Sequence, residues 1–210
     1  MWFDELNTPI GQLTIAADDS GLRFVLFENN KYDVPGRQDW RRDAGATQRV
    51  REQFLQYFAG ERRIFDLTLN PSGTEFQKKT WSMLAQIPFG ATWSYSELAA
   101  KIALSKAVRA VGAANGRNPL PIILPCHRVI GANGSLTGFG GGLPTKKWLL
   151  EHEAGSVHDR IFPEKPFAGS LIHLKQAAAA RFEYFERNSH FADIGRLLTW
   201  GCNYACEQLV

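Results

Sequence analysis

The sequence predicts an α+β fold in which a β-rich N-terminal region precedes a mostly helical region that contains a helix-turn-helix. Residues 8–17 and 22–27 are β-rich runs separated by the turn residues 18–21, a spacing typical of a hairpin. Beyond residue 74, apolar side chains recur at helical spacing instead. The expected parts are an N-terminal domain (1–70), a helical domain (71–154) and a C-terminal extension (155–210) that is either helical or poorly ordered.

The rest of the N-terminal region contains no chemical constellation, and we expect it to be structural. Residues 29–47 are polar and predict a loop, whereas residues 50–58 place apolar side chains on one helical face. Gly60 is a typical C-terminal stop for that helix. Leu67 and Leu69 suggest another short strand.

The helical region begins at Thr74, a residue type that commonly caps a helix. Residues 94–101 and 105–114 then form two short amphipathic segments joined by a short turn, which predicts a helix-turn-helix. Small side chains dominate the second segment, and they favour either tight helix packing or close approach to DNA. Its long side chains, Lys106 and Arg109, would stand out from it.

The charge of the chain is concentrated in one block. Residues 92–150 carry seven Lys/Arg and one Asp/Glu, a net charge of +6, whereas the whole 210-residue chain carries +3. Such a block indicates an anionic partner such as nucleic acid, or else a solvated surface. No segment has the ~18 apolar residues of a membrane span, the N-terminus does not read as a secretory signal, and the cysteines form no disulfide framework. We therefore expect a cytoplasmic protein with no membrane partner.

One of the cysteines has chemically distinctive neighbours. Cys126 follows Pro125 at the end of an apolar run, residues 122–124, that predicts a short strand, and His127 and Arg128 come directly after it. A cysteine with a pKa of about 8.5 is only about 3% thiolate at neutral pH, and a nearby base or cation raises that share. Adjacent strand residues point to opposite faces, so Cys126 and His127 can cooperate only if the backbone turns or a water bridges them. From the residues alone, Cys126 is either inert core or a nucleophile.

Short elements follow this cysteine. Residues 129–134 predict a strand and an Asn-Gly turn, and the glycine-rich residues 137–142 lack the ending of a phosphate-binding loop. A further helix is expected at residues 146–153. In the C-terminal extension, residues 171–198 contain two helical faces, and the pair Cys202 and Cys206 has no nearby histidine to complete a metal site.

Several of these residues occur in the order and spacing of the O6-alkylguanine-DNA alkyltransferases, and the chain resembles that family. The residues that carry the resemblance are Tyr95, Arg109, Asn118, the PCHRV segment at 125–129, the glycine-rich loop and the WLLEHE segment at 148–153. The resemblance implies an RNase H-like N-terminal domain and a single-use repair protein. Such a protein flips O6-alkylguanine out of duplex DNA and transfers the alkyl group to its own cysteine. O4-alkylthymine is an expected second substrate.

Position by position, the resemblance implies a catalytic group of four residues. Cys126 would accept the alkyl group, His127 would take the thiol proton through a water, and Glu153 would orient His127. Tyr95 would protonate the guanine ring as it leaves. The residues expected to contact the base are Tyr95, Val129, Gly140 and Lys146.

The same resemblance implies a mode of DNA binding. Arg109 would enter the base stack and fill the space of the extruded base, while the helix-turn-helix lies in the minor groove with little sequence readout. The residues expected to contact DNA are Arg109, Lys106, Asn118, Arg117 and Arg128. We expect a monomer, with cooperative binding along DNA left open, and no cofactor.

Two departures from the family pattern bear on these expectations. Gly140 stands where many relatives have a serine, which predicts a site that admits larger alkyl groups. Some relatives bind zinc through N-terminal Cys and His, whereas residues 1–91 contain neither, so no metal is expected. Two other classes stay open, namely a helix-turn-helix lesion sensor or regulator without chemistry, which Cys126 argues against, and a cysteine hydrolase, which gives Arg109 no role.

Overall fold

A four-stranded sheet forms the N-terminal part of the computed structural model, which describes residues 1–30, 32 and 34–161. Its strands, in the spatial order β3-β2-β1-β4, are β1 (Trp2–Thr8), β2 (Gly11–Asp18), β3 (Gly21–Phe27) and β4 (Arg41–Arg42). Neighbours among β1, β2 and β3 pair antiparallel, whereas β4 runs parallel to β1. The predicted hairpin is confirmed as the β2–β3 turn, but the sequence pattern misses β1.

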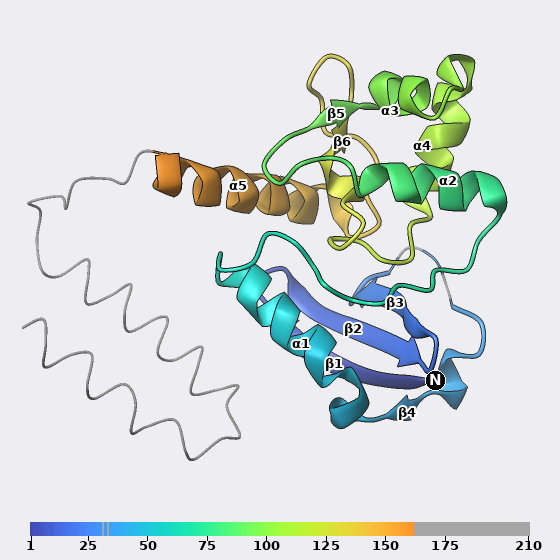
Figure 1. Ribbon diagram of the computed structural model, residues 1–210, viewed down its shortest axis with the longest axis vertical. Coiled ribbons are helices and arrows are strands. Elements are labelled where there is room, and N and C mark those ends of the chain that lie inside the picture. The colour runs from blue at the N-terminus through green and yellow to red at the C-terminus, as the bar shows by residue number, and fades with distance from the viewer. Residues whose placement is uncertain (31, 33, 162–210) are drawn as a thin grey trace, which may run out of the picture. The chain divides into compact units, whose positions relative to one another are not determined.

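Helix α1 (Ala44–Phe58) packs against β1 and β2 on one face of this sheet (Figure 1). Asp43 caps the helix by accepting a hydrogen bond from the Ala46 amide. The helix therefore begins before residue 50, and the predicted loop is shorter than expected. Gly60 follows with a left-handed φ of 76°, as its position after the helix predicts.

Two other expectations for this region need correction. The polar stretch before α1 is not wholly loop, because it contains the 3₁₀ helix Arg37–Asp39 and strand β4. Leu69 makes only an isolated bridge to Leu22 within the described residues, so no separate strand forms at residues 67–69.

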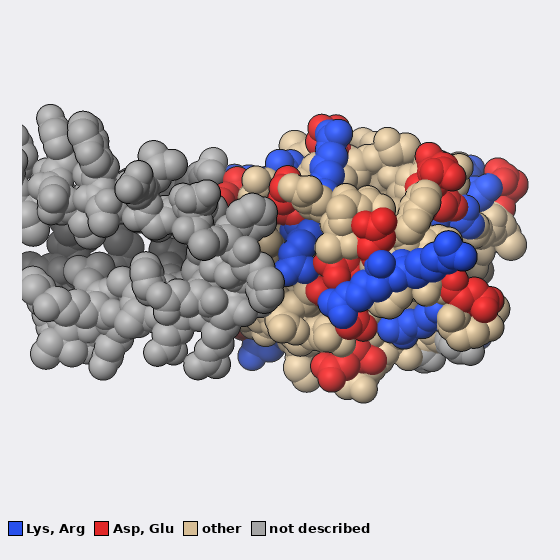
Figure 2. Space-filling model, turned by 90° about the horizontal axis from the view of Figure 1, so that it is seen from below, with Lys and Arg blue, Asp and Glu red and all other residues tan. Residues whose placement is uncertain are grey.

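Charges of both signs are interleaved on the sheet domain. Asp4 of β1 is buried and accepts hydrogen bonds from Arg51 of α1 at 2.9 Å and from Arg42 of β4 at 3.4 Å. Figure 2, seen from the side of β4 and the N-terminus, shows Lys and Arg side chains lying beside Asp and Glu over this face. That face therefore lacks the single sign of charge that attracts a nucleic acid.

The helical part follows the sheet domain in the chain. Its elements are α2 (Glu75–Leu84), β5 (Trp93–Ser94), α3 (Tyr95–Lys101), the 3₁₀ helix Ser105–Ala107, α4 (Val108–Gly116), the 3₁₀ helix Cys126–Arg128, β6 (Val129–Ile130) and α5 (Gly142–Ile161). Strands β5 and β6 pair in parallel. The two segments predicted as helices at residues 94–101 and 105–114 correspond to α3 and α4, and α5 extends past both ends of the expected helix.

One core connects the two parts. It includes the sheet face under α1, the inner faces of α2, α3 and α4, and Leu149 of α5. The Trp81 indole of α2 donates a hydrogen bond of 2.8 Å to the Ala114 carbonyl of α4, which fixes these helices together. Among the described residues, no helix has both the length and the apolar character that crossing a membrane requires. The predictions for residues 162–210, including those for Cys202 and Cys206, lie outside the described residues.

The predicted cap at Thr74 is confirmed, and its removal should weaken α2. The Thr74 hydroxyl accepts from the Gln77 amide at 3.3 Å, and the Gln77 side chain accepts from the Thr74 amide at 2.9 Å. We expect Thr74→Ala to lower the free energy of unfolding by about 1 kcal/mol, because the Gln77 amide at the helix start loses the hydroxyl that accepts its hydrogen bond. Urea unfolding measures this, with the exposed Thr92→Ala as a control that should change little. Equal stability of the two variants would contradict the role of the cap.

Candidate active site

Cys126 lies in a 3₁₀ turn, so the expected strand before it is wrong. Residues 119–124 bend and turn, and Ile122 has a left-handed φ of 75°. Three prolines within residues 119–125 lack amide donors, which prevents the regular ladder of a strand. The turn at Cys126–Arg128 also removes the strand constraint that would send adjacent side chains to opposite faces.

Asn118 holds the loop that ends at this cysteine. Its Nδ2 donates to the Leu124 carbonyl at 2.6 Å, and its Oδ1 accepts from the Leu120 amide at 3.0 Å. The side chain also hydrogen bonds with Cys126. The Asn118 side chain therefore holds the active-site loop, and its expected contact with DNA stays a prediction.

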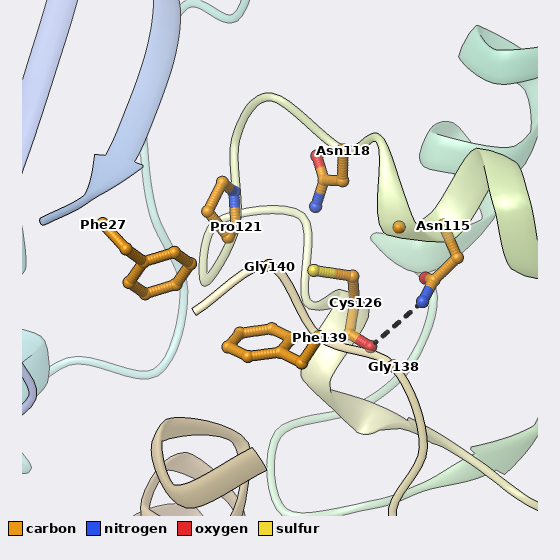
Figure 3. A pocket seen from close by; sticks show the side chains of 9 residues that line it. Phe27, Asn115, Asn118, Pro121, Cys126, Gly138, Phe139 and Gly140 are labelled. Carbon is orange, nitrogen blue, oxygen red and sulfur yellow. Dashed lines mark hydrogen bonds between the residues drawn. The ribbon is translucent and has the colours of Figure 1, made fainter. Parts of the chain in front are cut away.

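The Cys126 thiol points into a small pocket (Figure 3). The pocket has a volume of about 20 Å³, enough for about one water. Phe139 of the glycine-rich loop packs edge-on against Phe27 of β3, with ring centroids 5.3 Å apart. At Gly141 a Cβ would lie 2.9 Å from the Phe27 ring, so only glycine allows this approach. The pocket in this structure is too small for a purine.

Burial keeps the cysteine in its unreactive form. Cys126 is 5% exposed, and this burial raises the pKa of its thiol to about 11. The hydrogen bond from Asn118 and the charge of Lys146 act in the opposite direction, but they do not offset it. The resting thiol is therefore protonated at neutral pH, and it needs a base before it can act as a nucleophile.

His127 is placed to be that base. Its Nε2 lies 2.8 Å from Oε1 of Glu153, and both side chains are fully buried. An ionised carboxylate only accepts, so Nε2 carries the hydrogen and the lone pair sits on Nδ1. Within the described part of the chain, Nδ1 is buried with no hydrogen-bond partner. Burial lowers the pKa of His127 despite the neighbouring carboxylate, which leaves the imidazole neutral and able to take a proton.

Arg128 neutralises Glu153, which corrects its expected role in DNA binding. Its Nε lies 2.8 Å from Oε2 and its Nη2 lies 2.9 Å from Oε1, while Nη1 donates to the Ile87 carbonyl at 2.6 Å. The side chain is buried and cannot reach a phosphate. Burial alone would raise the pKa of Glu153, but the hydrogen bonds from His127 and Arg128 and the charge of Arg128 hold it well below its usual range. Glu153 therefore stays ionised.

Tyr95 and Lys146 lie against the glycine-rich loop. The Tyr95 hydroxyl donates to the Thr137 carbonyl at 3.3 Å, and burial raises the pKa of this tyrosine, so it keeps its proton. Lys146 donates to the Val129 and Thr137 carbonyls at 2.6 and 2.9 Å. Burial lowers the pKa of Lys146 to about 8. Lys146 thus ties the loop to β6, next to the ring of Tyr95 at 5.9 Å.

The remaining predicted residues divide between pocket and surface. Gly140 lines the pocket, and no atom lies within 4 Å of the position where its Cβ would be. Lys106 and Arg109 are exposed; Lys106 lies in the 3₁₀ helix Ser105–Ala107 and Arg109 in the first turn of α4, which follows it directly. Arg117 is exposed at the end of α4, with its guanidinium 5.8 Å from the Tyr32 ring.

Two family models match the chain. The ribonuclease-like domain of 6-O-methylguanine DNA methyltransferase matches residues 3–71, and the DNA binding domain of the same protein matches residues 75–155. The chain belongs to the 6-O-methylguanine DNA methyltransferase family. This confirms the predicted family, with a ribonuclease-like N-terminal part before a helical DNA-binding part.

Individual relatives of this methyltransferase family agree with the assignment. A methylated-DNA–protein-cysteine methyltransferase of Methanosarcina acetivorans is 46% identical over 153 residues, which cover 73% of this chain and 98% of that protein. One from Mycobacterium bovis is 48% identical over 148 residues, covering 70% and 89%. The crystal structure of Mycobacterium tuberculosis OGT in complex with DNA has a TM-score of 0.70 and 44% identity, covering 74% of this chain and 94% of that one.

Two residues of this methyltransferase site were not among those predicted from the sequence. Asn115 lines the pocket, and its Nδ2 lies 3.5 Å from the Cys126 carbonyl. Its place on the inner face of α4 with Val111 and Ala114 is a periodic signal that could have indicated it. Tyr57 of α1 contacts Glu153, and a partner so distant in sequence leaves no local signal. In the described residues no cluster of three or more His, Cys, Asp or Glu could hold a metal ion.

Proposed function

We propose that this methyltransferase repairs O6-alkylguanine, and O4-alkylthymine as a second substrate, by moving the alkyl group to Cys126 once per molecule. The observation that carries the proposal is a buried protonated thiol in a pocket, followed in the chain by a neutral histidine that an ionised Glu153 orients. The relatives are named as methyltransferases of methylated DNA and protein cysteine, which supports the same chemistry.

The chemistry follows from the protonation states. His127 takes the thiol proton at Nδ1 through a water, and Glu153 stabilises the imidazolium that forms. The thiolate sulfur then forms a bond to the alkyl carbon as the bond from that carbon to O6 breaks. Tyr95 gives its proton to the guanine ring, so that no purine anion leaves. A thioether has no leaving group for reversal, and each chain therefore acts once.

The proposed DNA contacts come from exposed residues in α4 and at its two ends. Arg109, Lys106 and Arg117 would meet the duplex in the minor groove, where α3 and α4 act as a helix-turn-helix with little sequence readout. Base flipping brings the lesion to Cys126, and Val129, Gly140 and Lys146 would contact or surround the base. The open space at Gly140 supports acceptance of larger alkyl groups.

We further propose that residues 1–70 and 71–154 are the two working domains. The protein would act as a monomer, with cooperative binding along DNA as the alternative. It would work in the cytoplasm, where a reducing environment keeps Cys126 a thiol. Incubation with duplex DNA that holds one O6-methylguanine tests the function, because loss of methyl from DNA should saturate at one per chain.

The role of Arg109 predicts a defect specific to paired lesions. Arg109→Ala should slow transfer from duplex DNA by roughly 10- to 100-fold. Extruding a base costs a few kcal/mol of unstacking, and the alanine cannot fill the gap that the base leaves in the stack. Single-turnover assays quenched at set times measure the transfer rate. The variant Lys147→Ala, at an exposed position of α5, is the control and should transfer at the wild-type rate. A lesion opposite an abasic site is easier to extrude, so on that substrate the rate of Arg109→Ala should lie closer to the wild-type rate. An equal defect on both substrates would contradict the proposed role.

A further inference from the structure

Glu153 accepts a hydrogen bond from the ribonuclease-like part, and the proposed mechanism does not use this bond. The Tyr57 hydroxyl of α1 donates to Oε1 of Glu153 at 2.9 Å, across 96 residues of sequence. Tyr57 is fully buried, and its ring packs against one aromatic side chain of α1 itself and three from other segments. These neighbours, with ring centroids 5.3, 5.6, 6.3 and 5.2 Å away, are Phe58, Phe65, Phe89 and His152.

The carboxylate of Glu153 is crowded on one oxygen. Oε1 accepts from the Tyr57 hydroxyl, from His127 Nε2 at 2.8 Å and from Arg128 Nη2 at 2.9 Å. Oε2 accepts from Arg128 Nε and, at 3.2 Å, from the Gly90 amide. A carboxylate oxygen has two lone pairs, so the three donors on Oε1 compete for the same negative charge. The negative charge that the Tyr57 hydroxyl draws from Oε1 is then less available to stabilise an imidazolium at His127.

Tyr57 remains a donor throughout the working pH range. Burial, and then the charge and hydrogen bond of Glu153, raise the pKa of Tyr57 well above its ordinary value. The phenol therefore keeps its proton and cannot become a second anion beside Glu153, and the ionised Glu153 has no proton to donate to it. Its position is also fixed from the backbone, because His152 Nε2 lies 2.8 Å from the Tyr57 carbonyl.

We propose that Tyr57 is a positioning residue through which the ribonuclease-like domain sets the proton affinity of His127. The hydroxyl withdraws charge from the oxygen of Glu153 that faces the imidazole, and this keeps His127 neutral and ready to take the thiol proton. The inference rests on the proposed function for its link to rate, although the proton affinity of His127 can be measured without DNA.

The charged groups around His127 come from several elements. Arg128 of the same 3₁₀ turn and Lys146 of α5 both disfavour the imidazolium, whereas Glu153 of α5 favours it. Arg63 lies over the Phe89 ring, which packs against Tyr57, at 5.3 Å. Replacement of Tyr57 changes none of these charges, so a shift at His127 would come from the lost hydroxyl.

Tyr57→Phe is the matched variant, because it removes one oxygen and keeps the ring. Glu153 retains four donors and stays ionised. With Oε1 less neutralised, the imidazolium is better stabilised, and the pKa of His127 rises. The rate falls as pH drops through that pKa, so the acid midpoint of the single-turnover rate should move upward by about half a unit to one unit. NMR titration of the His127 imidazole should show the same upward shift.

Two companion variants keep the test decisive. Phe65→Leu weakens the same aromatic cluster, and it should lower the melting temperature without moving the acid midpoint. Site-specific replacement of Tyr57 by 3-fluorotyrosine, a stronger donor of the same size, should move the midpoint downward. Because this expected shift of the acid midpoint has the opposite sign, it tests the inference even if Tyr57→Phe fails to fold.

An acid midpoint and a His127 titration that match wild type in both Tyr57 variants would overturn the inference, and Tyr57 would then be structural. Wild-type protein that transfers no methyl group would instead overturn the proposed function. In that case the NMR titration alone still decides whether Tyr57 sets the proton affinity of His127.

Discussion

Replacing Cys126 with alanine is expected to abolish alkyl transfer while leaving DNA binding intact. The variant removes the sulfur that must form the new bond, and no other group in the pocket can replace it. The pocket contains amides, aromatic rings and glycines, none of which is a nucleophile of comparable strength. The exposed cations on α4 that we propose bind DNA are unchanged, so affinity for a lesion-bearing duplex should stay within about twofold.

Transfer by the Cys126→Ala protein would be measured as methyl lost from an O6-methylguanine duplex under excess protein. We expect no loss above the protein-free background, together with a stability change of about 1 kcal/mol for a small buried truncation. A double Cys202→Ala, Cys206→Ala variant is the matched control, because it removes the other two thiols of the chain and should leave transfer at the wild-type rate if Cys126 is the acceptor. Transfer by the Cys126→Ala protein would refute the assignment of the nucleophile.

Removing the carboxylate of Glu153 should have the largest effect on stability. Glu153→Ala leaves the buried Arg128 without its counter-ion and strands the donors of His127, Tyr57 and Gly90. Loss of one partner from a buried ion pair costs about 3–5 kcal/mol. Glu153→Gln should cost less, because an amide oxygen still accepts. The exposed Glu151→Ala, whose Lys147 partner is 3.7 Å away, should stay within about 0.5 kcal/mol of wild type.

The pH dependence of this effect has a definite sign. The folded-state pKa of Glu153 lies well below its unfolded value of about 4.3. Its contribution to stability is therefore complete above that value, and it is lost progressively as the pH falls below it. Urea unfolding at pH 7 and at pH 3 should show the difference between wild type and Glu153→Ala shrinking at the lower pH. A difference that stays constant would show that the charge of Glu153 does not carry the effect.

The sequence predicted the features that depend on local chemistry. A few neighbouring residues are enough to predict the cap at Thr74, the glycine after α1 and the helical segments around Lys106. The resemblance to the alkyltransferases placed Glu153 beside His127, although 26 residues separate them. Local pattern alone gives no reason for that pairing.

The failures have physical causes too. The apolar run at residues 122–124 predicts a strand by its composition, but the surrounding prolines and the left-handed Ile122 force a turn. Strand β1 escapes detection because its buried face includes Asp4, whose charge is met by arginines of α1 and β4. From the sequence, Arg128 is a candidate for binding DNA phosphates. Its pairing with Glu153 becomes visible only in the folded structure. Such pairings depend on the tertiary arrangement, and a single sequence does not display them.

The central claim is that Cys126 becomes the alkylated residue. Intact mass of the wild-type protein after incubation with a duplex that holds one O6-methylguanine, followed by peptide mapping, tests it most directly. One added methyl group on Cys126, saturating at one per chain, is the expected result. An unchanged mass despite tight binding to the duplex would contradict it and would favour a lesion sensor without chemistry.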